Sequence, residues 1–113
     1  VSKAFYCDIL GLKIIAENYR EDRASYKLDF ALPNGNQIEL FSFPYPPKRP
    51  TQPEARGLRH LAFSVTCIED VVEHLEKNNV EVEPIRIDEF THSRYTFFQD
   101  PDGLPLELYE VST

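Results

Sequence analysis

The sequence lacks several features that would point to particular classes of protein. Its 113 residues contain no apolar run as long as a membrane span, and no secretory signal pattern opens the chain. Lysine and arginine together number 12 against 19 acidic residues, which gives a net charge of -7. Because phosphate binding needs a basic face, we expect no nucleic acid as a partner, and the lack of a membrane-length apolar run leads us to expect no membrane.

Cysteine is scarce and methionine is absent. Two cysteines, Cys7 and Cys67, are too few for a disulfide framework and lack CxxC spacing. We therefore expect two reduced thiols in a cytoplasmic protein. Removal of an initiator before Val1 would explain the missing methionine, and so would a missing N-terminal stretch; the repeat described next favours the second explanation.

What the sequence does contain is an internal repeat with an offset of 68 residues. Residues 33–41 (PNGNQIELF) match residues 101–109 (PDGLPLELY), which aligns Glu39 with Glu107. An Asn-Gly or Asp-Gly dipeptide stands at the same place in each copy and is typical of a hairpin turn. The repeat predicts that one module is present twice.

The same offset aligns the predicted helices and strands. The apolar pattern predicts a helix over 2–10 that ends at Gly11, and a helix over 69–78 that ends at Asn79. The predicted strands are 12–19, 25–32 and 36–43 in the first module, and 58–66, 80–87, 93–99 and 104–110 in the second. The first module has no counterpart of strand 58–66, so we expect the sequence to be a fragment whose opening strand lies upstream.

These elements predict a single α+β domain over residues 1–113, built from two tandem modules. Module one covers 1–43, a proline-rich connector covers 44–57, and module two covers 58–113. Prolines at this density exclude sheet interior and predict a stiff connector on the surface. The basic residues of the connector, which we expect to be solvated, are Lys48, Arg49 and Arg56.

Three of the strands place one ionisable group opposite their apolar face. Alternation puts Glu39, His60 and Glu107 on such faces, among aromatic or small neighbours. Taken singly, each is more commonly a solvent-facing or hydrogen-bonded residue. The equivalence of Glu39 and Glu107 in the repeat favours a shared ion, and imidazole with carboxylate suits Zn, Ni, Co, Mn or Fe.

Four segments of the chain resemble the vicinal oxygen chelate superfamily. That superfamily includes glyoxalase I, bleomycin-resistance proteins, fosfomycin-resistance transferases and extradiol dioxygenases. The segments are FYCDILGLKI at 5–14, NGNQIELFSF at 34–43, GLRHLAFSV at 57–65 and YTFFQDPDGLPLELYE at 95–110. The likeness is closest to small bacterial glyoxalase-I-like, or lactoylglutathione-lyase-like, proteins. It implies two βαβββ modules that form a partly open mixed β-barrel around a divalent metal.

The resemblance also implies a ligand set and a reaction. In the lyase branch a His on the first strand and a Glu on the last strand of each module hold the metal. By position these are His60 and Glu107 in module two and Glu39 in module one; the first-module His falls on the absent strand. The implied reaction forms an enediolate from an α-oxo carbonyl thiol adduct, with Glu107 as base and Glu39 as ligand and catalytic partner. A carboxylate at position 39 argues against the dioxygenase branch, which resembles the two-His, one-carboxylate iron site.

Other readings of the same scaffold stay open. The main alternative is a bleomycin-resistance-type protein that sequesters a small hydrophobic molecule without chemistry, in an aromatic pocket made by Phe41, Phe43, Tyr95 and Phe97. A thiol transferase, an epimerase or a dioxygenase is a further alternative. Phe43 stands where glyoxalase I has an Asn that contacts glutathione, which predicts another thiol or none.

Two further expectations concern binding and assembly. Three arginines are candidates either for binding a substrate carboxylate or for ordinary solvated surface, namely Arg20, Arg23 and Arg94. Relatives with paired modules commonly build their sites across a dimer interface, so the resemblance implies a homodimer acting on a small-molecule substrate.

Overall fold

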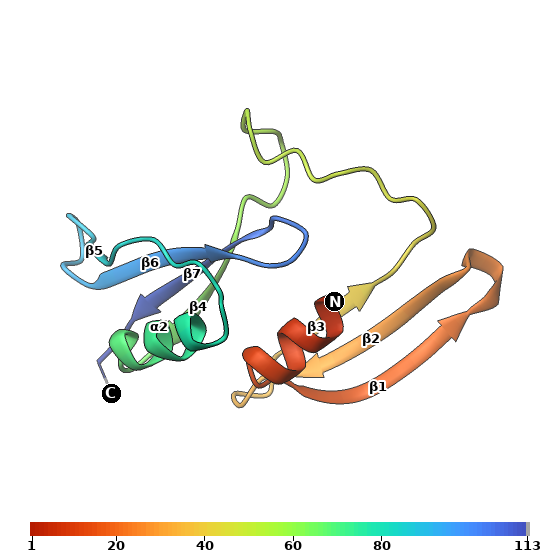
Figure 1. The fold of residues 1–113 in the computed structure, drawn as a ribbon, viewed down its shortest axis with the longest axis horizontal. Helices are drawn as coiled ribbons and strands as arrows, with labels where there is room; N and C mark the ends of the chain where they lie inside the picture. The colour runs from red at the N-terminus through yellow and green to blue at the C-terminus, as the bar shows by residue number, and fades with distance from the viewer. Residues whose placement is uncertain (113) are drawn as a thin grey trace. The chain divides into compact units, whose positions relative to one another are not determined.

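The computed structural model describes residues 1–112, which divide into two compact units, the first over residues 1–48 and the second from residue 49 onward (Figure 1). Each unit has its own β-sheet. None of the described helices is long and apolar enough to cross a bilayer. Cys7 and Cys67 are both free thiols.

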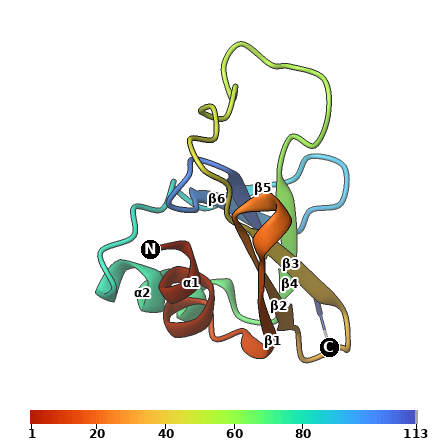
Figure 2. The ribbon, with the colours of Figure 1, turned by 90° about the vertical axis from the view of Figure 1, so that its right-hand side faces the viewer.

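The first unit is a short helical segment followed by an antiparallel sheet of order β1-β2-β3. Its elements are α1 (Ser2–Ala4), the π-helical turn η1 (Phe5–Ile9), β1 (Lys13–Arg20), the 3-10 turn η2 (Glu21–Arg23), β2 (Ser25–Ala31) and β3 (Gln37–Phe41). The helical segment lies on one face of the sheet (Figure 2), where the Tyr6 ring is 5.9 Å from the ring of Phe30. Both side chains are buried, so this contact forms the core of the unit.

The second unit has the chain order β-α-β-β-β predicted for a complete module. Its elements are β4 (Leu61–Val65), α2 (Ile68–Lys77), β5 (Arg86–Ile87), β6 (Arg94–Gln99) and β7 (Pro105–Glu110). The sheet order is β4-β7-β6-β5, with β4 parallel to β7 and the other pairs antiparallel. Ile68 and Leu75 of α2 are fully buried, as is Leu106 of β7, so the helix covers one face of the sheet.

The strand pairing confirms the duplication. The pair Asp29 with Glu39 in β2–β3 corresponds to the pair Phe97 with Glu107 in β6–β7, 68 residues later. All five residue pairs of β2–β3 have a counterpart at this offset. The two hairpins therefore have the same register, and a shared register puts Glu39 and Glu107 at equivalent points of equivalent sheets.

The turns and helix ends repeat in the same way. The Gly35 N–H donates to the Leu32 carbonyl and the Gly103 N–H to the Asp100 carbonyl, each at 3.0 Å. Gly11 and Asn79 have φ values of 75° and 63°, the left-handed conformation predicted for the two helix ends. The α+β class and the module order are thus confirmed, with seven strands in two sheets, neither of which closes on itself within residues 1–112.

The predicted strand 80–87 was wrong over most of its length, because only Arg86–Ile87 is a strand. Pro84 has no N–H to give to a ladder. The preceding residue makes only isolated bonds: the Glu83 N–H donates to the Phe97 carbonyl at 3.0 Å, and its carbonyl accepts from Thr96 Oγ1 at 2.6 Å. This segment follows the sheet without regular pairing.

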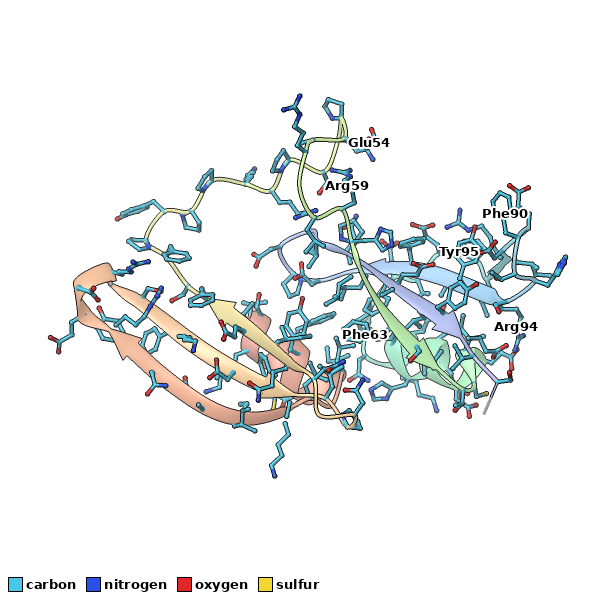
Figure 3. The ribbon with its side chains drawn as sticks, turned by 180° about the vertical axis from the view of Figure 1, so that it is seen from behind. Glu54, Arg59, Phe63, Phe90, Arg94 and Tyr95 are labelled. Carbon is cyan, nitrogen blue, oxygen red and sulfur yellow. The ribbon has the colours of Figure 1, made fainter. Side chains whose placement is uncertain are left out.

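The predicted strand 58–66 begins three residues late, at Leu61, because side chains take up the earlier carbonyls. Arg49 Nη2 donates to the carbonyls of Leu58, at 2.7 Å, and Arg59, at 3.1 Å. The expectation that Arg49 is solvated was therefore wrong. The Arg59 side chain (Figure 3) in turn donates to the Thr51 carbonyl at 2.9 Å. The side chains of Arg49 and Arg59 therefore hydrogen-bond the two sides of the loop that leads into β4 to each other.

Candidate functional site

His60 and Glu107 lie together on one face of the second sheet. The distance from His60 Nε2 to Glu107 Oε1 is 3.1 Å. Glu107 is in β7, between Ala62 of the parallel strand β4 and Phe97 of the antiparallel strand β6. His60 comes two residues before Ala62, so alternation directs both side chains to the face of the sheet opposite α2. The structure therefore brings two of the three predicted ligands together.

The surroundings of this pair are apolar or small. The His60 ring meets the Phe97 ring edge to face, with 5.1 Å between centroids. Ala62 and Ser64 are the β4 residues on this face, so no large β4 side chain stands above Glu107. The side chain of His60 is 40% exposed and that of Glu107 only 15%, which leaves the imidazole open and the carboxylate shielded. An imidazole nitrogen and a carboxylate oxygen this close together are a donor set that fits Zn and the other first-row divalent ions.

Glu39 belongs to the first unit, where a lysine accompanies it. Lys27 Nζ lies 3.6 Å from Glu39 Oε1 and 3.6 Å from Asp29 Oδ1. No group of three His, Cys, Asp or Glu side chains suited to a metal ion occurs within residues 1–112. A joint role of Glu39 with His60 and Glu107 stays a prediction.

Lys27 and Asp29 lie beside Glu39, and sequence reasoning missed them. In the repeat they replace Tyr95 and Phe97, so this face of the first sheet is charged where the matching face of the second sheet is aromatic. Asp29 Oδ1 is buried and has no hydrogen-bond donor among the described residues. The Lys27 ammonium, 3.6 Å from this oxygen, is the opposite charge beside it. The available signal was alternation, since residues 27 and 29 are polar while Leu28 and Phe30 between and beyond them are buried.

The four aromatic residues of the predicted pocket form two separate pairs, each with an arginine. In the first unit the rings of Phe41 and Phe43 stack at 6.1 Å. Arg20 lies over them, 4.8 Å and 5.8 Å from their centroids. Arg20 Nη2 also donates to Ser25 Oγ at 2.9 Å, so this arginine is held within its own unit. A pocket shared by all four rings stays a prediction.

In the second unit Tyr95 and Phe97 are edge to face, with centroids 6.2 Å apart. The guanidinium carbon of Arg86 lies 5.2 Å from the Tyr95 centroid and 5.8 Å from that of Phe97. Both distances are typical of cation–π contacts. Arg86 thus lies over the aromatic rings beside the His60–Glu107 pair. No pattern of residue spacing distinguishes it from the other arginines of the chain.

Arg94 is engaged with carboxylates of its own chain. Its Nε and Nη2 donate to the two oxygens of Glu110, each at 2.9 Å, and its Nη1 bonds to Glu69. Glu110 Oε2 also accepts the N–H of Ile68, the first residue of α2, at 3.0 Å. The Arg94 and Ile68 hydrogen bonds lower the pKa of Glu110, and Glu110 and Glu69 raise the pKa of Arg94. These bonds favour a structural role for Arg94 over substrate binding.

Comparison with known proteins gives consistent matches along the whole chain. The family model described as Glyoxalase/Bleomycin resistance protein/Dioxygenase superfamily matches residues 1–108. The uncharacterized protein YaeR of Escherichia coli K12 is 64% identical over 97% of this chain. The uncharacterized protein YwkD of Bacillus subtilis 168 is 59% identical over 96% of this chain. Each match covers 85% of the relative. The crystal structure of the glyoxalase family protein from Enterococcus faecalis is 48% identical, with a TM-score of 0.90 over 96% of this chain and 86% of that one.

Proposed function

The chain belongs to the glyoxalase/bleomycin resistance protein/dioxygenase superfamily, and from this we propose that it is a metal-dependent lyase or isomerase of the glyoxalase I type. Its substrate is an α-oxo carbonyl compound carried as a thiol adduct, as in methylglyoxal detoxification. The observation that carries the proposal is the pair His60–Glu107, joined at 3.1 Å on an open sheet face. The register that makes Glu39 equivalent to Glu107 supports it.

Glu39, His60 and Glu107 are the residues that would hold the metal, which is a divalent Zn, Ni, Co, Mn or Fe ion. When bound, such an ion would supply positive charge that stabilises negative charge developing on the substrate oxygens. Glu107 takes the proton from the substrate carbon and returns it to the neighbouring carbon, as a general base and then a general acid. Its 15% exposure keeps competing water away from that proton, and the edge contact with Phe97 fixes the ring of His60.

Turnover by the full-length protein tests this proposal. Loaded with Ni or Zn, it should convert the methylglyoxal–glutathione adduct to the thioester, followed by ultraviolet absorbance. Glu107→Gln should lower kcat by about 100-fold or more, because removal of a general base costs that much. Glu81→Gln, an exposed glutamate of the same unit, is the matched control and should keep kcat unchanged. Absence of turnover with every one of these divalent ions would contradict the glyoxalase assignment.

The second candidate function is sequestration of a small hydrophobic molecule without chemistry. The exposed rings of Phe41 and Phe43 favour it, since 38% and 48% of these residues stay accessible. Metal analysis separates the candidates, because a ligand that binds only the folded state raises thermal stability. A full-length preparation that holds no metal, and whose Tm does not rise when metal is added, favours the sequestering protein. A thiol transferase or epimerase on this scaffold instead binds metal but leaves the glyoxalase substrate unchanged.

We also propose that the protein is a cytoplasmic homodimer. Superfamily membership supports the dimer, and the two free thiols support a reducing compartment. Light scattering on a gel-filtered sample should give twice the mass of one chain; a mass of one chain contradicts the dimer.

A further inference from the structure

We propose that Arg86 binds a carboxylate of the substrate beside the His60–Glu107 pair, so that the protein prefers small α-oxo carbonyl substrates, and their thiol adducts, that carry a carboxylate. This inference rests on the proposed function, because it gives the substrate class for the same site. It assigns the specificity to a residue that is neither a proposed ligand nor the proposed base.

The strand register places Arg86 on the face that carries the pair. Arg86 of β5 is paired with Tyr95 of β6, and Tyr95 is paired with Tyr109 of β7. Paired residues of antiparallel strands point to the same side of a sheet. Glu107 and Phe97 are paired two residues farther along β7 and β6, so they point to that same side. Figure 3 shows Tyr95 on this sheet.

The contacts extend this placement from the backbone to the side chains. The guanidinium of Arg86 lies over the rings of Tyr95 and Phe97, at 5.2 Å and 5.8 Å. The ring of Phe97 in turn meets the ring of His60 at 5.1 Å. A single aromatic ring therefore separates the cation from the imidazole of the pair. A group held by Arg86 therefore lies on the same sheet face as whatever His60 and Glu107 hold, with the Phe97 ring between the two positions.

Arg86 keeps hydrogen-bonding capacity for a ligand. Its Nη2 donates to Glu83 Oε1 at 2.7 Å, and within residues 1–112 this is its one hydrogen-bonding partner. Both side chains are half exposed, at 49% and 56%, and exposed ion pairs are weak. Arg94 differs, because all three of its nitrogens bond to Glu110 or Glu69. A guanidinium that is already ordered over two rings can present its fork to a carboxylate with little loss of side-chain entropy.

The spacing of the strands indicates how large the substrate is. Arg86 starts two strands away from β7, roughly 10 Å at about 4.8 Å per strand, and its side chain crosses part of that distance over Tyr95 and Phe97. The carboxylate must therefore lie only a few bonds from the reacting carbon. A distant carboxylate on a long thiol carrier does not meet this condition, whereas a carboxylate on the short oxo carbonyl part of the substrate does.

Binding of pyruvate and of its uncharged amide, pyruvamide, to the metal-loaded full-length protein tests the inference. Calorimetry should show that Arg86→Met weakens pyruvate binding by about tenfold, the usual effect of one charge-assisted contact, and leaves pyruvamide binding unchanged. Arg86→Lys should recover part of the affinity. Arg56→Met, which removes an exposed arginine of the same unit, is the matched control and should not change either affinity.

Equal binding of pyruvate to the wild type and Arg86→Met would overturn the inference, and so would equal binding of pyruvate and pyruvamide to the wild type. Failure of the proposed function has a different signature. In that case metal-dependent turnover is absent while the pyruvate preference still depends on Arg86. Glu107→Gln, compared at saturating metal, separates the two roles further. It should lower kcat by about 100-fold or more and keep the difference in pyruvate affinity between arginine and methionine at position 86.

Discussion

At the scale of single residues, the two halves of the repeat share a backbone and differ in charge. Lys27 and Asp29 stand where the second unit has Tyr95 and Phe97, although the strand register is the same. The second unit thus presents Glu107 with an imidazole and aromatic rings. The first presents Glu39 with an ammonium group 3.6 Å away. A cation bound by Glu39 has to share that carboxylate with Lys27.

This sharing predicts that Lys27→Met strengthens metal binding. Removal of the ammonium takes away a like charge close to the incoming ion, and we expect the metal Kd to fall by roughly threefold to tenfold, about 1 kcal/mol. Calorimetric titration of the full-length protein with Zn measures it. Lys3→Met is the control, because Lys3 pairs with Glu17 at 2.9 Å on the same unit, away from Glu39 in sequence and register. An increase in Kd for Lys27→Met would contradict competition at Glu39.

At the scale of elements, the start of α2 depends on an ion pair between two neighbouring strands of the sheet. Glu110 of β7 accepts the Ile68 N–H, one of the groups that a helix N-terminus leaves without an intrahelical acceptor. Arg94 of β6 holds that carboxylate through two hydrogen bonds of 2.9 Å. No side chain caps the helix from within its own first turn. The helix is therefore fixed to the sheet that carries the site.

The pH dependence of stability should report this contact. The pKa of Glu110 is lowered from its ordinary value of 4.5, chiefly by the Arg94 hydrogen bonds. A lowered pKa in the folded state contributes stability that is present above 4.5 and is lost as the pH falls through the folded value. Glu110→Gln should therefore lower the urea midpoint at pH 7, and the difference from the wild type should shrink below pH 4.5.

Glu73→Gln is the control for that experiment. Glu73 pairs with Lys77 at 3.1 Å on the exposed side of the same helix, and both side chains are more than half exposed. Because such surface pairs contribute little, its urea midpoint should match that of the wild type at every pH. A Glu110→Gln difference that stays constant from pH 7 into the acid range would mean that the charge of Glu110 does not stabilise α2.

The elements that sequence reasoning predicted well are those that local chemistry specifies. The turn at Gly103 needs a positive φ, and alternation along β7 separates Leu106 from Glu107; both are readable from the sequence alone. The segment 80–85 was mispredicted because an apolar, β-branched pattern does not show that its partners are isolated bonds to β6. The late start of β4 depends on Arg49, whose carbonyl acceptors are nine and ten residues away. No local pattern encodes such a contact.

At the scale of the whole molecule, the candidate site was also predictable from the sequence only in part. The repeat and the family resemblance singled out His60 and Glu107, and the structure places them 3.1 Å apart. Arg86 could not have been chosen from the sequence, because its position over Tyr95 and Phe97 depends on a two-residue strand that pairs with β6. A cation–π contact across strands has no signature in residue spacing. Tertiary structure is what distinguishes this arginine from Arg94.

Whether one ion uses both units is a property of the whole molecule, and a double-mutant cycle measures it. Glu39 lies in the first unit and Glu107 in the second. If both bind one ion, Glu39→Gln and Glu107→Gln should each weaken Zn binding strongly, by about tenfold to a hundredfold. The loss of Zn affinity in the double variant should then be much smaller than the product of the losses in the two single variants. The reason is that a ligand set from which one carboxylate is already missing loses less when the second is removed.

Independent sites predict the opposite result. Carboxylates that never share an ion would give two binding events in the wild type, and each substitution would abolish one of them without changing the other. Calorimetry of the full-length protein distinguishes these outcomes by stoichiometry as well as by affinity. One Zn per chain with a strongly non-additive cycle supports a shared centre, whether the two glutamates come from one chain or from the two chains of a dimer. Mixed dimers of one Glu39→Gln chain and one Glu107→Gln chain then separate those cases. If each site is built across the interface, one of the two sites in the mixed dimer has both glutamates intact. If each site is built within one chain, neither site does.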